Sequence, residues 1–280
     1  MRTGTLYLVA TPIGNLEDLT FRARRILAEV DLIACEDTRR TRRLLDHYGI
    51  ATPTLSFHEH NEASRGAALL ARLRRGERIA LVSDAGTPLL SDPGFTLVRE
   101  AIAGGIPVVP IPGPSAALAA LIASGLPTDR FLFLGFLPRR AGERRRALAA
   151  VAGLPFTLVL FEAPHRVAAL LEDIRETLGD RRIALGRELT KTFEEIVRGR
   201  PDELLAHLRA HPPRGEFTLV VEGAGEGAQQ AEGKADAAER LRALLAAGRP
   251  PVEAVAAVAR EAGISRREAY ELMLRLRGKR

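Results

Sequence analysis

The sequence predicts an α/β protein with two domains of alternating strands and helices, followed by a small helical unit. Short apolar segments alternate with helix-like stretches from residue 6 to residue 223, which is typical of a largely parallel sheet. A turn-rich segment, IPGPSA at 111–116, divides this alternation into two halves. A polar segment rich in Gly and Ala, at 223–237, precedes a basic C-terminal part. The expected units are a first α/β domain at 1–112, a second at 113–223, a linker at 224–237 and a basic helical tail at 238–280.

Apolar runs define the strands of both halves, in order along the chain. In the first half they lie at 6–10, 32–37, 54–57, 78–84 and 107–112. In the second half they lie at 131–136, 157–163, 182–189, 195–199 and 216–223. Segments with helical spacing of apolar residues lie between them, for example at 19–30, 62–76 and 166–179. The sequence therefore predicts ten strands with helices between them.

Composition indicates a folded protein of a reducing compartment. The chain has 280 residues, of which 46% are hydrophobic, so it has enough apolar side chains for full cores. Cys35 is the one cysteine, which excludes a disulfide framework within the chain. The N-terminal segment lacks the pattern of a signal peptide, and prolines and glycines interrupt the longest apolar segment. We therefore expect a cytoplasmic protein without a membrane span.

The positive charge is concentrated in the C-terminal part. The net charge is +6, and residues 240–280 alone contain ten basic and four acidic residues, so this segment accounts for the whole excess. A basic segment suits a polyanion, because bound phosphates release counterions. It is equally consistent with a helical tail whose arginines face water. The segment VAREAGISRREAY at 258–270 has the pattern of a helix-turn-helix, which plain helical hairpins share.

The densest turn sequence, SDAGTPLLSDPG at 83–94, directly follows a buried strand. Gly86 and Gly94 allow positive φ and a close approach of the backbone, and two prolines make the loop stiff. In open α/β sheets, ligands bind at the carboxyl ends of strands. The loop therefore predicts a binding site for a polar small molecule. Whether its second Ser-Asp pair, Ser91 and Asp92, supports the first pair or reaches a substrate stays open.

Charged side chains follow two further strands of the first half. Glu36 and Asp37 precede four arginines, some of which must face solvent or phosphate because they cannot all share one helical face. The segment SFHEHNE at 56–62 places His58, Glu59 and His60 together. Loop or substrate contacts are favoured there over a metal site, because no third set of ligands accompanies the histidines.

The second half carries three charged segments at or near strand ends. FEAPHRV at 161–167 and GRELTKTFEE at 186–195 predict a polar cleft, although surface ion pairs are the usual fate of such runs. PRRAGERRR at 138–146 is a second arginine cluster, expected to form a mobile basic loop suited to phosphates.

Two common nucleotide-binding patterns are missing from the sequence. ATPIGNLEDLT at 10–20 leaves the first strand through Pro12 and Gly14, but it is not the G-x-G-x-x-G of a dinucleotide-binding turn. No Walker lysine motif occurs either. These patterns argue against a nucleotide-dependent dehydrogenase and against an ATPase.

Together, the motifs resemble one known family. They are LYLVATPIGNLEDLTFRA, CEDTRRTRRLL, SFHEHNE, VSDAGTPLLSDPG, IPGPSA, FLGFLP, FEAPHR and GRELTKTFEE, in this order from about Leu6 to Gly223. In this set and order they look like the bacterial 16S ribosomal RNA (cytidine-2′-O)-methyltransferases of the tetrapyrrole-methylase superfamily. The basic tail is also similar to that family.

The resemblance implies a fold, a cofactor and a reaction. The fold is two α/β domains of the tetrapyrrole-methylase type, with S-adenosylmethionine held in the cleft between them, in a homodimer. The reaction is 2′-O-ribose methylation of a cytidine in the decoding region of 16S rRNA, with the 30S subunit as the expected partner. Carried over by motif, the expected cofactor contacts are Pro12, Asp84, Ala85, Gly86, Ser115, Ala116, Phe161 and Glu162.

Methyl transfer from a sulfonium is an in-line displacement, in which positioning supplies much of the rate and no metal is required. The 2′-hydroxyl is a poor nucleophile, so a general base or a charge-stabilising group is expected. The catalytic candidates at strand ends are Glu36, Asp37, Glu59, Glu188 and Lys191, with His58 beside them. The candidates for binding RNA phosphates are Arg39, Arg40, Arg139, Arg140, Arg266 and Arg267.

Two other functions stay open from the residues alone. One is a methylase of a tetrapyrrole or another small molecule, which would need few of the arginines. The other is a non-catalytic nucleic-acid-binding regulator built around the tail, which would leave the loop at 83–94 unexplained.

Overall fold

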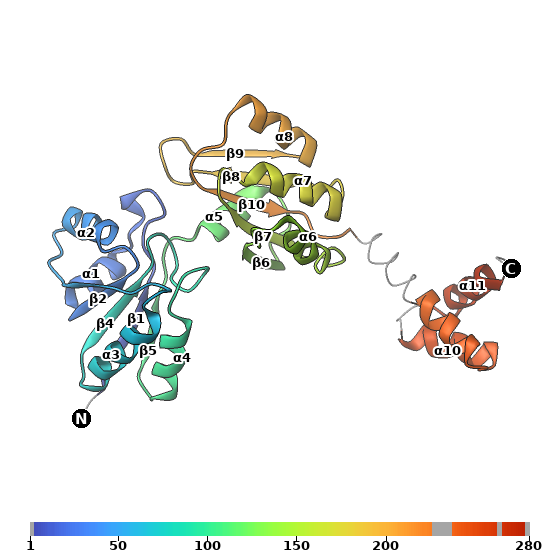
Figure 1. Cartoon of the computed structure of the whole chain (residues 1–280), viewed down its shortest axis with the longest axis horizontal. Helices are drawn as coiled ribbons and strands as arrows, with labels where there is room; N and C mark the ends of the chain where they lie inside the picture. The colour runs from blue at the N-terminus through green and yellow to red at the C-terminus, as the bar shows by residue number, and fades with distance from the viewer. Residues whose placement is uncertain (1–2, 226–236, 262–264, 278–280) are drawn as a thin grey trace.

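A computed structural model describes residues 3–225, 237–261 and 265–277. The chain forms two five-stranded sheets covered by helices, and a group of C-terminal helices (Figure 1). All ten expected strands are present, most of them one to three residues shorter than the apolar runs. The predicted α/β class with two domains and a C-terminal helical unit is confirmed. The exact boundaries proposed for these units stay a prediction.

The first domain contains five strands, four α-helices and one short 3₁₀-helix. In chain order these are β1 (Thr5–Val9), η1 (Leu16–Asp18), α1 (Phe21–Glu29), β2 (Leu32–Cys35), α2 (Thr38–His47), β3 (Thr54–Ser56), α3 (Glu62–Arg74), β4 (Arg78–Val82), α4 (Phe95–Ala103) and β5 (Val108–Ile111).

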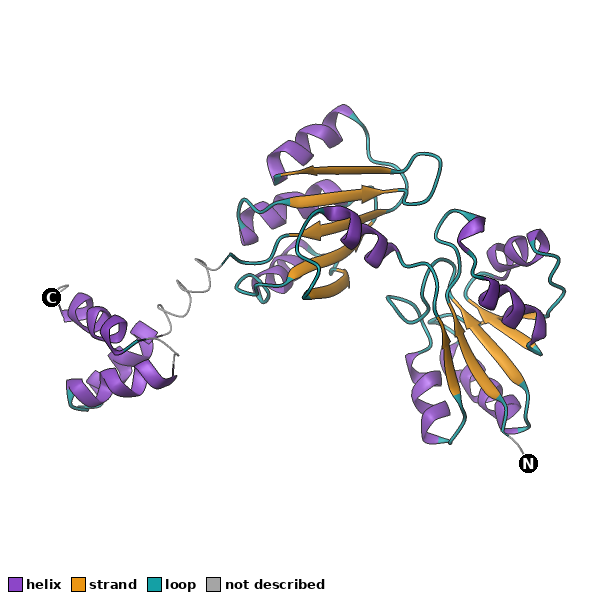
Figure 2. Ribbon diagram, turned by 180° about the vertical axis from the view of Figure 1, so that it is seen from behind, coloured by secondary structure: helices purple, strands orange, loops and turns teal. Residues whose placement is uncertain are grey.

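The first sheet is entirely parallel, with the strand order β3-β2-β4-β1-β5, as expected from the strand–helix alternation. Successive residues of its buried strands face opposite sides, because side chains alternate along a strand. Ile33 and Ala80 pack under α1 and α2, whereas Ala34 and Ile79 pack under α3 and α4. Because all five strands are parallel, the loops that follow them lie at the same edge of the sheet, and helices cover both faces (Figure 2).

The second domain contains four helices and five strands. In chain order these are α5 (Ala116–Ser124), β6 (Phe131–Phe136), α6 (Ala141–Ala149), β7 (Thr157–Glu162), α7 (Val167–Leu178), β8 (Ile183–Arg187), β9 (Glu195–Gly199), α8 (Pro201–Ala210) and β10 (Phe217–Val221).

The second sheet is mixed, so the expectation of a largely parallel sheet is wrong here. Its order is β6-β7-β10-β8-β9, and only β6 and β7 pair in parallel. The direction reverses at the connection 188–194, which joins β8 to β9 without a helix, and α8 then returns the chain so that β10 also runs antiparallel to β7 and β8. A short loop can join only antiparallel neighbours, so β9 runs back along β8.

Helices cover both faces of the second sheet. The helices α6, α7 and α8 pack on one face over Leu160, Leu185 and Leu219. The helix α5 packs on the other face over Val159 and Val220, and this core also includes Ile13 of the first domain. The two domains therefore share apolar contacts through α5.

The arginine cluster at 138–146 is partly helical, which corrects the expectation of a mobile loop. Residues from Ala141 onward form α6, and the Arg144 side chain is buried. Arg144 Nε donates to Asp173 Oδ2 at 2.5 Å, because a buried guanidinium needs a paired carboxylate. Arg139 and Arg140 stay exposed before the helix.

The C-terminal unit has its own small core. Residues 237–246 are helical, and α10 (Pro251–Glu261) and α11 (Arg266–Arg277) follow. Leu241, Val258 and Met273 meet in the core of these helices. The proposed linker at 224–237 and the turn of the helix-turn-helix pattern fall mainly on 226–236 and 262–264, which lie outside the described residues.

Candidate functional site

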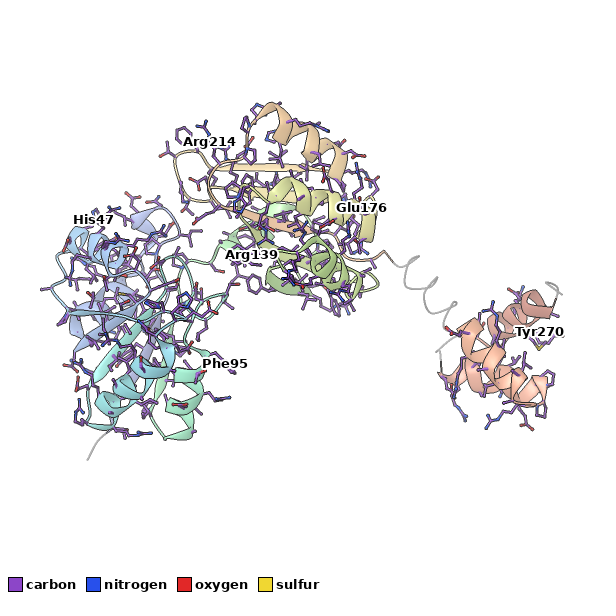
Figure 3. The ribbon with its side chains drawn as sticks, in the orientation of Figure 1. His47, Phe95, Arg139, Glu176, Arg214 and Tyr270 are labelled. Atoms are coloured by element: carbon purple, nitrogen blue, oxygen red, sulfur yellow. The ribbon has the colours of Figure 1, made fainter. Side chains whose placement is uncertain are left out.

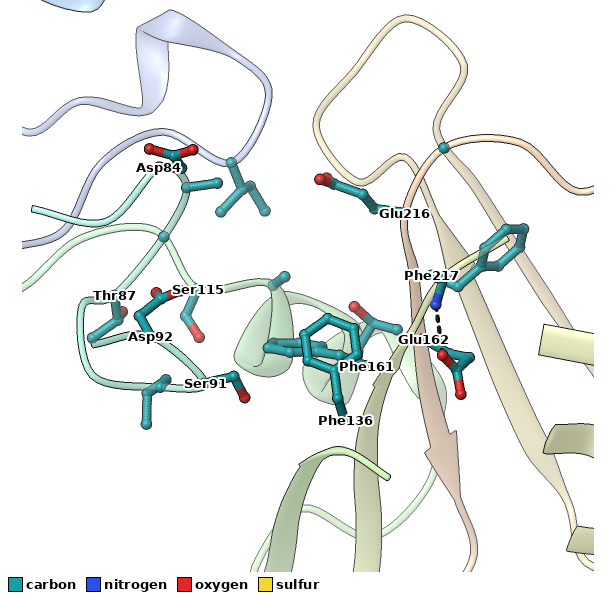
Figure 4. A pocket seen from close by; sticks show the side chains of 18 of the residues that line it. Asp84, Thr87, Ser91, Asp92, Ser115, Phe136, Phe161, Glu162, Glu216 and Phe217 are labelled. Atoms are coloured by element: carbon teal, nitrogen blue, oxygen red, sulfur yellow. Dashed lines mark hydrogen bonds between the residues drawn. The ribbon is translucent and has the colours of Figure 1, made fainter. Parts of the chain in front are cut away.

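A cavity of about 400 Å³ lies between the two domains (Figure 4). Its walls come from the loops after β2 and β4, from the start of α5, and from β6, β7 and β10. The lining residues are Ile13, Glu36, Arg40, Asp84, Ala85, Gly86, Thr87, Leu90, Ser91, Asp92, Ser115, Ala116, Phe136, Phe161, Glu162, Ala163, Pro164, Gly215, Glu216, Phe217 and Thr218.

Backbone hydrogen bonds fix the loop after β4 to the loop after β1. Gly86 and Thr11 exchange both of their N–H···O bonds at 2.9 Å, and the Thr11 hydroxyl donates to the Ser83 carbonyl at 3.1 Å. Gly86 has φ of +85°, and a Cβ there would lie 3.2 Å from Ile13 Cγ2. Glycine therefore allows the loop to approach Ile13 closely and keeps the backbone of 84–86 in the cavity wall.

The carboxylate of Asp84 is compensated by two partners. Its Oδ1 accepts from the Asp37 backbone N–H at 2.8 Å, and its Oδ2 pairs with Arg40 at 3.6 Å. The Asp37 side chain caps α2 instead, accepting from the Arg39 backbone N–H at 2.8 Å. Hydrogen bonds from Arg39 lower the pKa of Asp37. Asp37 is thus an ionised helix cap that ties the end of β2 to the loop after β4.

Glu36 and Asp92 also line the cavity, but their surroundings are less polar. Burial, followed by the charge of nearby Asp84, raises the pKa of Glu36. Burial, followed by the charge of Glu36, raises the pKa of Asp92 to about 6, although a hydrogen bond from Ser83 opposes this shift. Both carboxylates therefore take up a proton more readily than an exposed acid does.

The second domain supplies an apolar wall. Phe136 and Phe161 approach each other with ring centroids 5.6 Å apart, and both line the cavity opposite Asp84 and Ser115 (Figure 4). Glu162 follows Phe161, but its side chain is fully buried and pairs with Arg166 at 3.1 Å. Arg166 also donates to the Leu137 carbonyl at 2.8 Å, which holds the chain just before Arg139. The pair therefore connects the cavity wall to the exposed arginines.

An ion-pair cluster stands at the edge of the cavity. Lys191 Nζ donates to Glu188 Oε1 at 2.7 Å and to Glu216 Oε2 at 3.0 Å. Burial opposes both charges, but the mutual hydrogen bonds prevail, so the pKa of Glu188 is lowered and that of Lys191 is raised. The Lys191 side chain also lies against Gly14, where a Cβ would come within 2.3 Å of Lys191 Cγ. The cluster thus braces the second domain against the first.

The structure brings most of the expected cofactor residues together. Asp84, Ala85, Gly86, Ser115, Ala116, Phe161 and Glu162 all line the cavity. Pro12 lies in a smaller neighbouring hollow of about 150 Å³, beside Thr11 and Asp84. The Ser115 hydroxyl also caps α5 by accepting from the Leu118 N–H at 3.4 Å.

The catalytic candidates are not brought together. Among them, Glu36 lines the cavity, whereas Asp37 caps α2 and Glu59 is exposed on the loop after β3. Glu188 and Lys191 reach the cavity only through Glu216. His58 Nε2 lies 3.1 Å from the Asn61 side chain, in a local loop contact.

The arginine candidates for RNA contact lie at several exposed places. Arg40 lines the cavity beside Asp84, and Arg39 is exposed on the same helix. Arg139 lies on the side of the second domain that faces the first domain, whereas Glu176 lies on its far side (Figure 3). Arg266 and Arg267 are exposed at the start of α11.

Sequence reasoning missed several lining residues. The sequence marks Asp92 as part of a Ser-Asp pair in the binding loop. It does not reveal that the side chain is partly buried in the cavity wall. Phe136 ends a predicted strand and directly precedes the arginine cluster. This position at a strand end indicates a place in the wall of the site. Leu90 lies within the predicted binding loop at 83–94, whereas Glu216 carries no signal, because its place depends on how the two domains meet.

Metal sites and membrane spans can be judged over residues 3–225, 237–261 and 265–277, which the structure describes. In these segments, no group of three or more His, Cys, Asp or Glu residues is placed to hold a metal ion. None of their helices combines the length and the apolar character needed to cross a bilayer.

Comparison with known proteins identifies the family. The sequence profile of the Tetrapyrrole (Corrin/Porphyrin) Methylases matches residues 5–205. A protein of Halalkalibacterium halodurans named Ribosomal RNA small subunit methyltransferase I is 49% identical over 272 residues, which cover 96% of this chain and 94% of that protein. A protein of the same name from Mesorhizobium japonicum is 51% identical over 274 residues, covering 97% and 92%.

A solved structure supports the same fold. The uroporphyrin-III C-methyl transferase from Thermus thermophilus, complexed with S-adenyl homocysteine, superimposes with a TM-score of 0.56 at 22% identity. The match covers 78% of this chain and 97% of that protein. The chain is a methyltransferase that uses S-adenosylmethionine, and it belongs to the ribosomal RNA small subunit methyltransferase I family within the tetrapyrrole methylases.

Proposed function

We propose that this protein transfers a methyl group from S-adenosylmethionine to the 2′-hydroxyl of a cytidine in the decoding region of 16S rRNA. The observation that carries the proposal is the cavity between the domains, which combines the residues of the family motifs with exposed arginines nearby. The names of the relatives support small-subunit ribosomal RNA as the substrate. The cytidine and its ribose oxygen rest on the motif resemblance.

The residues of the cavity fit S-adenosylmethionine. Asp84, Ala85 and Gly86 line the cavity, and the positive φ of Gly86 lets this loop pack closely against Ile13, so its backbone stands where a polar ligand can reach it. Phe136 and Phe161 offer an apolar wall for an aromatic base. Asp84, Ala85, Gly86, Ser115 and Ala116 would hold the cofactor from the first side, and Phe161 and Glu162 from the other, with Pro12 behind the loop.

Residues of the protein then have to orient the 2′-hydroxyl that receives the methyl group, and one of them has to take up its proton. The bound cofactor supplies an activated methyl group on a sulfonium. Of the five proposed catalytic residues, Glu36 is the best placed to accept a proton at its carboxylate, because it lines the cavity and its pKa is raised. Glu188 and Lys191 would act indirectly, by holding Glu216 at the cavity. Asp37 would stabilise the start of α2, and Glu59 would contact RNA.

Exposed arginines supply the proposed contacts with RNA phosphates. Arg39 and Arg40 would bind on the first domain, and Arg139 and Arg140 on the second. The basic C-terminal unit would add Arg266 and Arg267 from α11. A splayed-out cytidine would enter the cavity, and its unstacked base together with the local RNA shape would supply the sequence specificity.

We propose that the protein acts as a cytoplasmic homodimer on the 30S subunit. Apolar side chains on two helices support self-association: Phe95 and Ile102 of α4 are 69% and 62% exposed, and Ile122 of α5 is 77% exposed. Contiguous exposed apolar surface marks contacts with other proteins, and we propose that these side chains belong to the interface between the protomers. The units 1–112, 113–223, 224–237 and 238–280 are the domain boundaries that we propose for each protomer.

The test is a methyl-transfer assay with labelled S-adenosylmethionine. Purified 30S subunits that lack native methylation and naked 16S rRNA are offered separately, and the RNA is digested to nucleosides. We expect label on the ribose of one cytidine. Label on a base or on another nucleotide would contradict the proposal, and absence of label from both RNAs would favour a small-molecule substrate. An Arg139→Ala/Arg140→Ala variant should transfer less at equal cofactor occupancy.

A further inference from the structure

Two carboxylates in the cavity have no ion-pair partner among the residues that the structure describes. Asp84 pairs with Arg40, Glu162 pairs with Arg166 at 3.1 Å, and Glu216 pairs with Lys191 at 3.0 Å. In the described part of the chain, no basic side chain forms an ion pair with Glu36 or Asp92, although His58 and Arg40 exert a favourable electrostatic effect on Glu36. Charges taken partly out of water are normally paired, so these two half-buried carboxylates leave the cavity wall with unpaired negative charge.

The backbone holds Asp92 in this position. The flanking residues Leu89 and Ser91 have φ of +74° and +69°, which non-glycine residues rarely adopt. Ser91 packs against the bulge of β6, where Gly135 leaves room for the Ser91 hydroxyl. This loop therefore connects the wall of the first domain to the second domain, and Asp92 faces the cavity from it (Figure 4).

The groups around Asp92 come from several elements. Glu36 at the end of β2 and Asp84 after β4 are negative, and Arg40 on α2 is already paired with Asp84. Ser83 contributes a hydroxyl. Across the cavity, Arg166 is paired with Glu162 and Lys191 is paired with Glu216. Neither basic side chain therefore offers a free positive charge to Asp92. A ligand with a positive centre would relieve the repulsion between Glu36 and Asp92.

We propose that Asp92, together with Glu36, binds the positively charged sulfonium of the methyl donor and thereby distinguishes the donor from its uncharged thioether product. The inference rests on the proposed placement of the cofactor in this cavity, but it does not depend on the RNA substrate. Donor and product differ in one methyl group and one positive charge. Their amino acid and adenosine parts are the same, so those parts contribute equally to both affinities.

The size and the pH dependence of the effect follow from electrostatics. A unit charge a few ångströms from a partly buried carboxylate changes affinity by about tenfold or more. Because Asp92 has a pKa of about 6 without the donor, it is largely protonated below that pH. Donor affinity should therefore rise as the pH increases through this range, whereas product affinity should change little. Binding of the cation should also release protons.

The experiment is isothermal titration calorimetry of the full-length protein, without RNA. The ligands are S-adenosylmethionine, S-adenosylhomocysteine and an analogue with an ammonium group in place of the methylsulfonium. From about pH 5 to about pH 8, we expect the ratio of donor affinity to product affinity to rise about tenfold in the native protein. The ammonium analogue should follow the donor.

Three variants test whether the difference between donor and product affinity arises from the carboxylates of the cavity. Asp92→Asn should reduce the donor-to-product ratio at neutral pH by about tenfold and remove most of its pH dependence. It should retain product affinity, which also shows that the variant is folded. Glu36→Gln should have a smaller effect in the same direction. Glu172→Gln, which removes an exposed carboxylate on α7, should change neither the donor-to-product ratio nor its pH dependence.

The inference is wrong if Asp92→Asn weakens donor and product equally, or if the native ratio does not change with pH. Failure of the proposed function gives other results. If neither ligand binds, the cavity does not hold the cofactor. If charge selection is present but no RNA is methylated, the RNA substrate is wrong while the role of Asp92 stands.

Discussion

Asp84 and Asp92 lie in one loop, each after a serine, yet the structure gives them different surroundings. Asp84 accepts a backbone hydrogen bond from Asp37 and pairs with Arg40, so its charge stabilises the start of α2. Asp92 has a hydroxyl partner and a like-charged neighbour instead. The same dipeptide thus serves as a structural anchor in one place and as a reactive, proton-binding group in the other.

Removing the Asp84 side chain should affect both stability and binding. We expect Asp84→Ala to lower the free energy of unfolding by about 1–3 kcal/mol, because the Asp37 N–H loses a charged acceptor in a mostly buried place. Asp84→Asn should lose less, since an amide oxygen can still accept from that N–H. Urea unfolding of both variants measures the difference. Equal losses would mean that the hydrogen bond to Asp37 contributes little.

The ion pair of Glu188 and Lys191 should make stability depend on pH at the acidic end. The folded-state pKa of Glu188 is lowered, so its contribution is present above the ordinary pKa of 4.5 and is lost as the pH falls through the lowered value. Glu188→Gln should therefore cost about 1 kcal/mol at neutral pH and nothing at strongly acid pH. Urea unfolding at several pH values checks this. A cost independent of pH would indicate lost packing against Gly215 instead.

At the scale of elements, glycines decide how closely the two domains approach. The loop between β8 and β9 lays the Lys191 side chain over Gly14, and the loop before α4 sets Ser91 against Gly135. Both contacts join segments far apart in the chain. They set the spacing of the cavity walls, so we expect them to affect ligand binding as well as stability.

A Cβ at Gly14 should disturb this arrangement. It would come within 2.3 Å of Lys191 Cγ, so the lysine would have to leave Glu188 and Glu216. We expect Gly14→Ala to cost about 1–3 kcal/mol in the free energy of unfolding and to weaken donor binding.

Gly142→Ala is the matched control for this substitution. Gly142 lies in α6 with open space around its Cβ position, so alanine there should be neutral or stabilising by up to about 1 kcal/mol. Thermal unfolding and calorimetry measure both variants. If Gly14→Ala behaves like Gly142→Ala, the interdomain contact does not hold the cavity.

At the scale of the whole molecule, the basic C-terminal unit should contribute to RNA affinity through charge. Each arginine that neutralises a phosphate adds about one to the slope of log affinity against log salt. Arg266→Ala/Arg267→Ala should therefore reduce this slope by up to about two, without changing cofactor affinity. RNA binding at several salt concentrations measures the slope. An unchanged slope would place these arginines outside the interface.

Local patterns predicted much of this molecule. Apolar runs located all ten strands, and the motif at 83–94 located one wall of the cavity. The short gap between the expected strands at 182–189 and 195–199 already indicates an antiparallel pair, but the direction of β10 between β7 and β8 could not be predicted, because a strand reads alike in either direction. Long-range pairings cannot be predicted from local patterns either: Arg144 belongs to a cluster that suits phosphates, but in the structure it is buried and pairs with Asp173, 29 residues away. The burial of Asp92 likewise depends on how two domains meet.

The central claim is that the cavity between the domains holds the methyl donor. The most direct measurement is a crystal structure of the protein with S-adenosylmethionine or its ammonium analogue bound. The account predicts that the ligand lies between the backbone of 84–86 and Phe161, with its positive centre beside Asp92 and Glu36. A ligand bound outside this cavity, or with its positive centre turned toward the aromatic wall and away from both carboxylates, would contradict it.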